Sequence, residues 1–298
     1  MNEKRYVILA DKSGQLANQI VRLSHFIAHS AEHKYILYNT SFQPLLQYFV
    51  IPKSEEYAHI RLKHSSNKKL NAFLFKIVRK SSSVLQKISR KSPWHECIST
   101  YKLEVNATHL DFYDLEGSEF LTLLETKKYL ILKGWKYRSR KLLPKHRELI
   151  KNFFHLAHPF ARNVKQKIDE GRNESDLLIG VHIRRGDYAF FEGGKYFYQD
   201  DVYRRCMEDA QRLFANKKIK FLICSNEAVN PVSFTGLDFV NGTGHFVEDL
   251  YSLAGCDYII GPPSTYSMWA SFYGNVPFRM IRASDDQINL EDFHVFTI

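Results

Sequence analysis

The stretch Leu177-Leu-Ile-Gly-Val-His-Ile-Arg-Arg-Gly-Asp-Tyr188 indicates the fold most clearly. Its first part, 177–183, is mostly apolar and predicts a strand buried on both faces of a parallel sheet. Arg184, Arg185 and Asp187 follow at the point where this strand ends. Ligands of open α/β sheets bind outside the carboxyl ends of the strands, so we expect a ligand site here.

Strand and helix patterns alternate on both sides of this stretch. A helix is predicted, for example, from the helical spacing of Leu16, Ile20, Leu23 and Ile27. The other predicted elements are strands at 6–10, 35–38, 129–132, 219–224, 258–260 and 278–281 and helices at 144–154, 201–215, 248–255 and 265–273. Strands that alternate with helices indicate parallel α/β layers. The polar segment 169–176 separates the two halves, which predicts domains at 1–170 and 171–298 that face a central cleft.

The composition is typical of a soluble globular protein. The 298 residues are 44% hydrophobic and 25% charged, and no apolar run approaches the roughly 20 residues of a membrane span. The apolar run 6–10 is too short for the core of a secretory signal, so we expect a cytoplasmic protein. The four cysteines lack zinc-type spacing and no Asp-x-Asp motif occurs, so we expect no metal site.

The adjacent arginines Arg184 and Arg185 are suited to binding phosphate. Each guanidinium presents a rigid fork of donors that matches phosphate oxygens, and it stays protonated at physiological pH. The pair can therefore offset the charge of a diphosphate leaving group without a metal ion. The alternative is a solvated turn in which the Arg-Gly-Asp sequence occurs by chance.

Further polar groups lie next to other predicted strand ends. Ser264, Thr265 and Ser267 stand at the start of a predicted helix, where N–H groups and hydroxyls favour an anion, although such residues are also ordinary helix caps. Asp249 can accept hydrogen bonds from the amino edge of guanine, or it can be a solvated surface residue. Gly14 lets a ligand approach the backbone after the first strand, but no P-loop or dinucleotide-binding glycine motif is present.

In their order along the chain, these segments resemble the fucosyltransferases of the α1,2 type, glycosyltransferase family 11, and of the related α1,6 group. The family hallmark, His-x-Arg-Arg-x-Asp, is matched by His182, Arg184, Arg185 and Asp187. The Gly-Asp-Tyr sequence at 186–188 is most similar to the α1,2 branch. The N-terminal pattern Gly-x-Leu-Gly-Asn-Gln is matched from Gly14 through Asn18, except for Ala17, and the C-terminal pattern is matched at 249–269.

The resemblance implies a GT-B fold of two Rossmann-like domains and an inverting, metal-independent transfer of fucose from GDP-fucose, with no other cofactor. The implied acceptor is a hydroxyl of an oligosaccharide, polysaccharide or lipid-linked glycan, and the implied linkage is α1,2. The implied donor-binding residues are His182 and Asp249 for guanine, Arg184 and Arg185 for the diphosphate, Ser264, Thr265 and Ser267 for the β-phosphate, and Gly14 and Asn18 in the N-terminal motif. The alternatives are another linkage, GDP-mannose as donor, or a protein acceptor.

Glu192 is the residue that we expect to act as general base. Its spacing from His182 is similar to that of the proposed base in the α1,6 group, and its aromatic neighbours at 190 and 191 can raise a carboxyl pKa by burial. The alternative is an exposed loop glutamate. Asp187 is the second candidate base, although the resemblance favours it as an orienting partner of the arginines.

The net charge of +10 is concentrated between Arg61 and Lys91, which holds ten Lys/Arg and no acid. An apolar stripe within this segment predicts peripheral contact with an anionic membrane at its inner face, which suits a lipid-linked acceptor, although a solvated helix face is the alternative. A basic nucleic-acid-binding protein is a remote alternative, because no nucleic-acid motif accompanies the charge and we expect no nucleic-acid partner.

Overall fold

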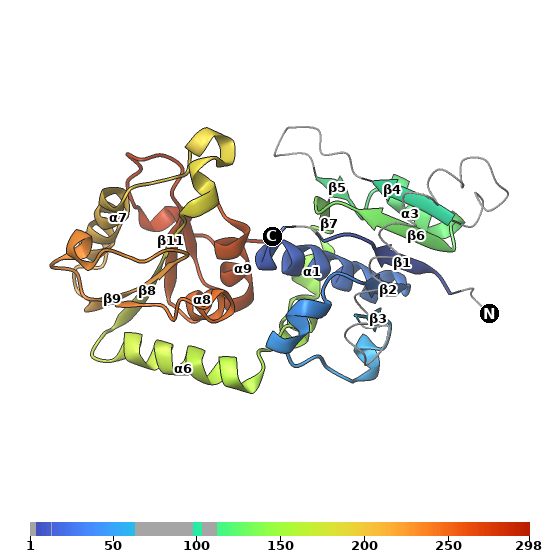
Figure 1. The fold of residues 1–298 in the computed structure, drawn as a ribbon, viewed down its shortest axis with the longest axis horizontal. Helices are drawn as coiled ribbons and strands as arrows, with labels where there is room; N and C mark the ends of the chain where they lie inside the picture. The colour runs from blue at the N-terminus through green and yellow to red at the C-terminus, as the bar shows by residue number, and fades with distance from the viewer. Residues whose placement is uncertain (1–3, 13, 63–97, 103–111) are drawn as a thin grey trace. The chain divides into compact units, whose positions relative to one another are not determined.

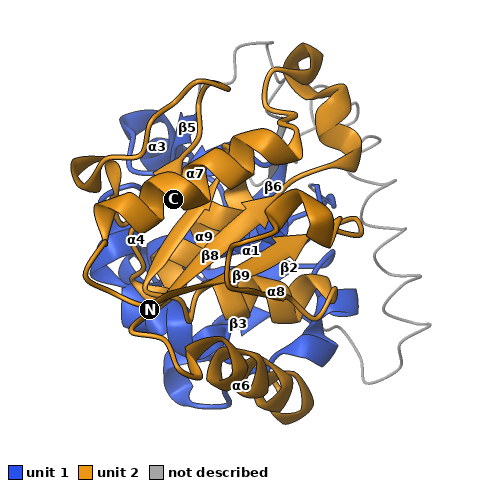
Figure 2. Ribbon diagram, turned by 90° about the vertical axis from the view of Figure 1, so that its left-hand side faces the viewer, with its two compact units in different colours: residues 1–155 blue, residues 156–298 orange. Residues whose placement is uncertain are grey.

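The structure is a computed structural model of the chain, and it describes residues 4–12, 14–62, 98–102 and 112–298, with the backbone alone for 98–102. The chain forms two compact units, 1–155 and 156–298, which are coloured separately in Figure 2. Each unit contains a five-stranded parallel sheet, so the predicted α/β fold is confirmed.

The sheet of the first unit has the strand order β3-β2-β1-β6-β4. Its strands are β1 (Tyr6–Leu9), β2 (Ile36–Asn39), β3 (Ile60–Arg61), β4 (Ile98–Lys102) and β6 (Tyr129–Lys133). The helix α1 (Leu16–His33) connects β1 to β2 (Figure 1). Its four apolar positions at helical spacing, 16, 20, 23 and 27, are all buried as predicted.

Shorter elements complete the first unit. They are the 3₁₀ helices η1 (Gln43–Tyr48) and η2 (Glu55–Tyr57), the helices α3 (Ser118–Thr126), α4 (Leu142–Lys145) and α5 (Arg147–Phe153), and a second small sheet of β5 (Tyr113–Asp114) with β7 (Tyr137–Arg138). The single helix predicted at 144–154 is therefore divided between α4 and α5. His146, which separates them, has a backbone conformation outside the helical range.

The second unit has the strand order β10-β9-β8-β11-β12. Its strands are β8 (Leu177–Ile183), β9 (Ile219–Ser225), β10 (Phe239–Asn241), β11 (Tyr258–Gly261) and β12 (Phe278–Met280), and its helices are α6 (His158–Arg172), α7 (Asp200–Leu213), α8 (Phe246–Leu253) and α9 (Thr265–Gly274). Figures 1 and 2 show α7 on one face of this sheet and α6 and α8 on the other. The core under α7 includes Val181, Cys206, Met207, Phe221 and Ile260, so β8 is buried on both faces as its apolar sequence predicts.

The helix α6 belongs to the second unit, because it packs on α8 and on the strands β8, β9 and β10 of the second sheet. The chain divides before α6, at 155/156, whereas the boundary predicted after residue 170 falls inside this helix. The polar composition of 169–176 therefore marks the solvated end of a helix and the turn that leads into β8.

Two further features concern membranes and thiols. Within the described residues, no helix combines the length and apolarity needed to cross a bilayer. Cys206, Cys224 and Cys256 are buried free cysteines, and burial raises the pKa of each thiol.

Candidate active site

The carboxyl ends of β8, β9 and β11 meet at one edge of the second sheet, because all three strands are parallel. The segments that follow them carry most of the residues predicted to form the site. The first is the 3₁₀ helix η4 (Gly186–Ala189) after β8, and another is the loop between β11 and α9. This edge is the position at which open α/β sheets bind ligands.

Arg184 lies at the end of β8 and forms an ion pair with a partly solvated aspartate. Its Nη2 atom lies 2.7 Å from Oδ1 of Asp187, whose side chain is 59% exposed. Its guanidinium also lies 5.3 Å from the ring centroid of Tyr188, and the Tyr188 hydroxyl donates to the carbonyl of Pro263 at 2.6 Å. Since exposed ion pairs contribute little to stability, an anion can compete with Asp187 for this guanidinium at small cost.

Arg185 points to a different set of partners from Arg184. Its fork donates to the carbonyl of Tyr198 and to the carboxylate of Asp200, and its backbone N–H donates to Oδ1 of Asn226 at 2.7 Å. Its guanidinium also lies 5.8 Å from the ring centroid of Tyr203 in α7. These contacts join β8 to α7 and β9, so Arg185 positions the strand end on which Arg184 lies.

His182 is buried near the end of β8 and is 4% exposed. Its Nδ1 atom lies 2.7 Å from Oγ of Ser267, and its ring centroid lies 4.9 Å from the ring centroid of Tyr266. Burial lowers the pKa of His182 to about 3, with a further contribution from the charge of Arg184. The imidazole is therefore neutral at physiological pH and can act as both donor and acceptor.

The hydroxyl residues of α9 have separate positions. Ser264 is the N-cap of α9, because its Oγ accepts a hydrogen bond from the N–H of Tyr266 at 3.2 Å. Thr265 is the first residue of the helix and is half-buried. Ser267 is fully buried and bonded to His182. In this structure, Ser267 therefore positions the histidine rather than lining open space for a phosphate.

Asp249 is buried in α8, which excludes the solvated surface position considered from the sequence. Its Oδ1 accepts from the N–H of Thr243 at 2.7 Å and from the Thr243 hydroxyl at 3.1 Å. A Cβ atom at Gly242 would lie only 2.5 Å from the same oxygen, so a glycine is required for this approach. Burial raises the pKa of Asp249, and these hydrogen bonds oppose the rise. Asp249 thus holds the turn at 242–244.

Glu192 lies in the short helix η5 (Phe191–Gly194) and is exposed. Its φ angle of 49° is in the left-handed region, and Gly193 and Gly194 also have positive φ. Phe190 is 87% exposed and Phe191 is 38% exposed, so these rings do not enclose the carboxyl group as the sequence suggested. Left-handed backbone at a non-glycine residue stores strain, which is a frequent feature of functional loops.

A cavity of about 540 Å³ lies beside Arg185 at the ends of β8 and β9. Its polar lining includes Asp201, Ser225, Glu227 and Asn230. The sequence predicted the strand at 219–224 that precedes Ser225, but it did not indicate that α7 brings Asp201 to the same place. Helix and strand periodicity identify which residues face solvent, not which exposed residues share a cavity.

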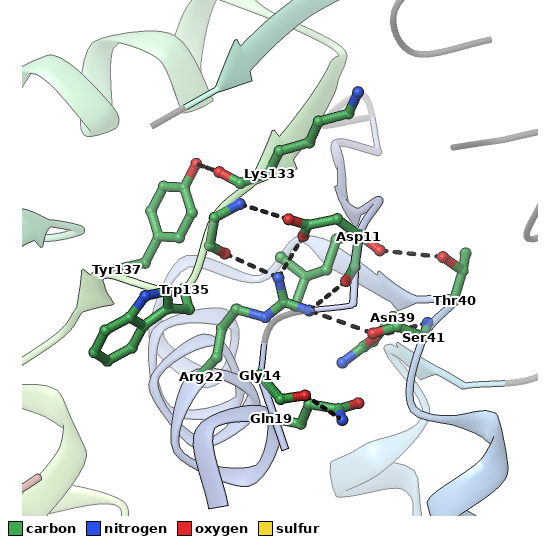
Figure 3. A network of polar contacts seen from close by, with 12 residues as sticks. Asp11, Gly14, Gln19, Arg22, Asn39, Thr40, Ser41, Lys133, Trp135 and Tyr137 are labelled. Atoms are coloured by element: carbon green, nitrogen blue, oxygen red, sulfur yellow. Dashed lines mark hydrogen bonds and ion pairs between the residues drawn. The ribbon is translucent and has the colours of Figure 1, made fainter. Parts of the chain in front are cut away.

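Gly14 and Asn18 belong to the first unit, where they lie at the N-terminus of α1. Gly14 has a φ of 64°, and a Cβ atom there would lie 2.4 Å from Nδ2 of Asn18. Next to them, the buried Arg22 donates to Oδ1 of Asp11 at 2.6 Å and to the carbonyl of Gly134 at 2.9 Å (Figure 3). The sequence analysis missed this network, because a single arginine in an apolar helix has no recognisable pattern.

Two predictions concern ions and membranes. Within the described part of the chain, no three His, Cys, Asp or Glu side chains form a group that can hold a metal ion. The basic segment 61–91, for which membrane contact is predicted, lies outside the described residues except for its first two positions.

Comparison with known proteins indicates the class of this site. Residues 146–277, which make up most of the second unit, match the family model "Glycosyl transferase family 11". No curated protein matches the chain.

Several solved structures are similar to the whole chain. A point mutant of FUT1 from Arabidopsis thaliana, in complex with GDP, is 14% identical over 98% of this chain and 73% of its own, with a TM-score of 0.65. The fucosyltransferase NodZ from Bradyrhizobium is 14% identical over 98% of this chain and 97% of its own, with a TM-score of 0.55. POFUT1 in complex with GDP is 10% identical over 95% of this chain and 98% of its own, with a TM-score of 0.51.

The fold is therefore the GT-B fold found in solved fucosyltransferases. More particularly, residues 146–277 are similar to glycosyltransferase family 11.

Proposed function

We propose that this enzyme transfers fucose from GDP-fucose to a hydroxyl of a glycan acceptor, with inversion and formation of an α1,2 linkage. The observation that carries the proposal is the position of Arg184, at the end of β8 within the family 11 domain and paired with a partly solvated aspartate. Structural neighbours in complex with GDP and one soaked with GDP-fucose support the choice of donor.

In this proposal, Arg184 binds the diphosphate of the donor and Asp187 orients it. The guanidinium offers two parallel N–H donors to phosphate oxygens, and its charge offsets the negative charge that develops on GDP. The backbone N–H groups in the first turn of α9, which begins after Ser264, add a favourable dipole. No metal ion is needed for this neutralisation.

The proposed guanine contacts are His182 and Asp249. His182 is neutral, so it can share hydrogen bonds with a base without imposing a charge. Asp249 accepts from the 242–244 turn, and a carboxylate has capacity for further donors such as the guanine amino group. Gly14 and Asn18 are the remaining residues proposed to bind the donor.

In the proposed reaction, Glu192 is the general base. The acceptor oxygen forms a bond to the anomeric carbon while the bond from that carbon to the β-phosphate oxygen breaks, and GDP leaves with the electron pair. Glu192 takes the proton of the acceptor hydroxyl. Its exposed position leaves it accessible to an acceptor.

The donor half of the proposal is tested by calorimetry in EDTA with GDP, GDP-fucose, GDP-mannose and UDP-galactose. We expect Arg184→Ala to bind GDP and GDP-fucose roughly 10- to 100-fold more weakly than the wild type, while Arg162→Ala, which removes an exposed arginine of α6, binds them normally. Tighter binding of GDP-mannose than of GDP-fucose would indicate the other donor, and absence of guanine-nucleotide binding would refute the proposal.

The catalytic half is tested by Glu192→Gln. We expect about a 100-fold or greater loss of kcat with unchanged GDP binding, which is the usual contribution of general base catalysis. Glu174→Gln is a matched control, since Glu174 is also exposed and also has a positive φ. NMR analysis of the product identifies the linkage, and a product other than α1,2 would overturn that part of the proposal.

A further inference from the structure

The segment 134–139 of the first unit follows β6 at the carboxyl edge of the first sheet. Both of its ends are fixed to the layer formed by β1 and α1. The N–H of Gly134 donates to Oδ2 of Asp11 at 2.9 Å, and its carbonyl accepts from Arg22 (Figure 3). The N–H of Ser139 donates to Nδ1 of His25 at 3.0 Å. The side chains of this segment are therefore held in defined positions.

Arg138 lies in this segment and is 6% exposed. Its Nη1 donates to the carbonyls of Trp135 and Tyr137 at 3.0 and 2.9 Å. Its guanidinium lies 4.4 Å from the ring centroid of Phe112 and 5.4 Å from that of Trp135. Burial lowers the pKa of Arg138 to about 10, so the side chain remains charged at neutral pH.

No described carboxylate lies within ion-pair distance of Arg138. Asp114 stands opposite Arg138 in the register of β5 and β7, but its Oδ1 accepts from the backbone of Glu116. The carboxylate of Glu116 in turn accepts from the hydroxyl of Ser139 and from two backbone N–H groups. These two acids therefore bind backbone N–H groups and the Ser139 hydroxyl, and they do not serve Arg138 as counter-ions.

Arg22 is a buried arginine of the same unit that does have a carboxylate counter-ion, and it serves as a comparison. It is also buried, but its fork is paired with the carboxylate of Asp11. Arg138 has instead a second cation as neighbour, because the guanidinium of Arg140 lies 5.5 Å from the centroid of the same Phe112 ring. An uncompensated buried charge costs free energy, and cation–π contacts offset only part of it.

We propose that Arg138 and Arg140, together with the rings of Trp135 and Phe112, form a subsite for an acidic sugar residue of the acceptor glycan. The carboxylate or phosphate of such a residue supplies the missing counter-ion through charge-assisted hydrogen bonds to guanidinium donors. The apolar C–H face of the sugar packs on the half-buried rings. The assignment of this sugar to the acceptor rests on the proposed transferase function, whereas the binding of an anionic sugar does not.

The test is saturation-transfer NMR on the whole chain with methyl glucuronide, glucose 6-phosphate and methyl glucoside as probes. The first two carry a carboxylate and a phosphate on the same kind of ring, and the third is neutral. The variants are Arg140→Gln, which changes an exposed residue and is expected to fold, and Arg138→Met. The exposed Arg162→Gln in the second unit is the control. GDP binding by calorimetry is measured in parallel.

We expect the wild type to bind at least one anionic probe more tightly than methyl glucoside, and the variant at 140 to weaken that binding by about tenfold, as for loss of a charge-assisted contact. Whether glucuronide or glucose 6-phosphate binds more tightly distinguishes the carboxylate from the phosphate. Equal binding of the neutral and anionic probes, no binding of any probe, or unchanged binding in Arg140→Gln overturns the proposal. If the wild type binds glucuronide but does not bind GDP, only the assignment of GDP-fucose as donor is overturned, and the anionic subsite stands.

Discussion

Nδ1 of His182 lies 2.7 Å from Oγ of Ser267, and both side chains are buried. This hydrogen bond joins the end of β8 to the first turn of α9, so it connects the strand that carries Arg184 with the helix whose N-terminus is the candidate phosphate site. It also keeps a neutral imidazole in a place where the nearest charge is an arginine.

The free energy of unfolding is expected to decrease as the pH falls from 7 to 5. The pKa of His182 is about 3 in the folded state and 6.5 for the free side chain, so the unfolded state binds more protons between these values. The stabilising contribution is complete above pH 6.5 and is lost on acidification. Between pH 6.5 and 5 the loss is about 2 kcal/mol. Urea unfolding at pH 7 and pH 5 measures it.

A His182→Asn variant provides the control for this prediction. It cannot titrate in this range, so the difference in free energy between pH 7 and pH 5 should be smaller than in the wild type by about 2 kcal/mol. His29 in the first unit has a pKa that burial also lowers to about 3, and it should cause a residual pH dependence in the variant. An unchanged difference would show that folding does not lower the pKa of His182.

Substitution of the two adjacent arginines is expected to affect different properties, ligand binding for Arg184 and stability for Arg185. Arg184→Ala should weaken GDP binding by roughly 10- to 100-fold, since charge-assisted hydrogen bonds contribute about 1.5–3 kcal/mol each, with little change in thermal stability. Arg185→Ala should lower the melting temperature, because the tie from β8 to Tyr198 and Asp200 is lost. Calorimetry measures GDP affinity and thermal denaturation measures the melting temperature of both variants. Equal melting temperatures of Arg185→Ala and Arg184→Ala would contradict the structural role of Arg185.

Variants of Asp249 and Thr243 distinguish two roles of Asp249, which are direct contact with guanine and support of the turn at 242–244. Asp249→Asn is expected to weaken GDP binding about tenfold, as one charge-assisted hydrogen bond is removed. Thr243→Val removes the hydroxyl that donates to Asp249 and accepts from the N–H of His245, and it should leave GDP affinity nearly unchanged. Calorimetry with GDP measures both, and an equal loss in the two variants would mean that Asp249 acts through the turn.

Removal of Asp11 is expected to lower the free energy of unfolding more than removal of its ion-pair partner Arg22. Arg22 is fully buried, whereas the side chain of Asp11 is 26% exposed. Asp11→Ala leaves an uncompensated charge inside the unit and should cost about 3–5 kcal/mol. Arg22→Met leaves a carboxylate that water can reach and should cost less. Urea unfolding of the two variants compares them, and a larger cost for Arg22→Met would contradict this account.

The family motif and its position could be predicted from the sequence because both depend on local information. The apolar run 177–183 defines a buried strand, and the arginines must then lie at the carboxyl edge of a parallel sheet. The directions of the two arginines could not be predicted. Whether a side chain meets Asp187 or Asp200 depends on where α7 packs, and α7 is placed by the core beneath it.

The sequence by itself determined the α/β class and most of the strands and helices from β8 to β12, since residue periodicity is a property of the chain, but it did not indicate α6 or β10. Only the tertiary structure decided which buried polar side chains have hydrogen-bond or ion-pair partners. Asp249 is held by a turn, Ser267 is committed to His182, and Arg138 is buried with no carboxylate partner among the described residues. The physical reason is that burial and charge pairing are set by segments distant in the sequence, such as Asp11 and Gly134, which only the folded sheet brings together.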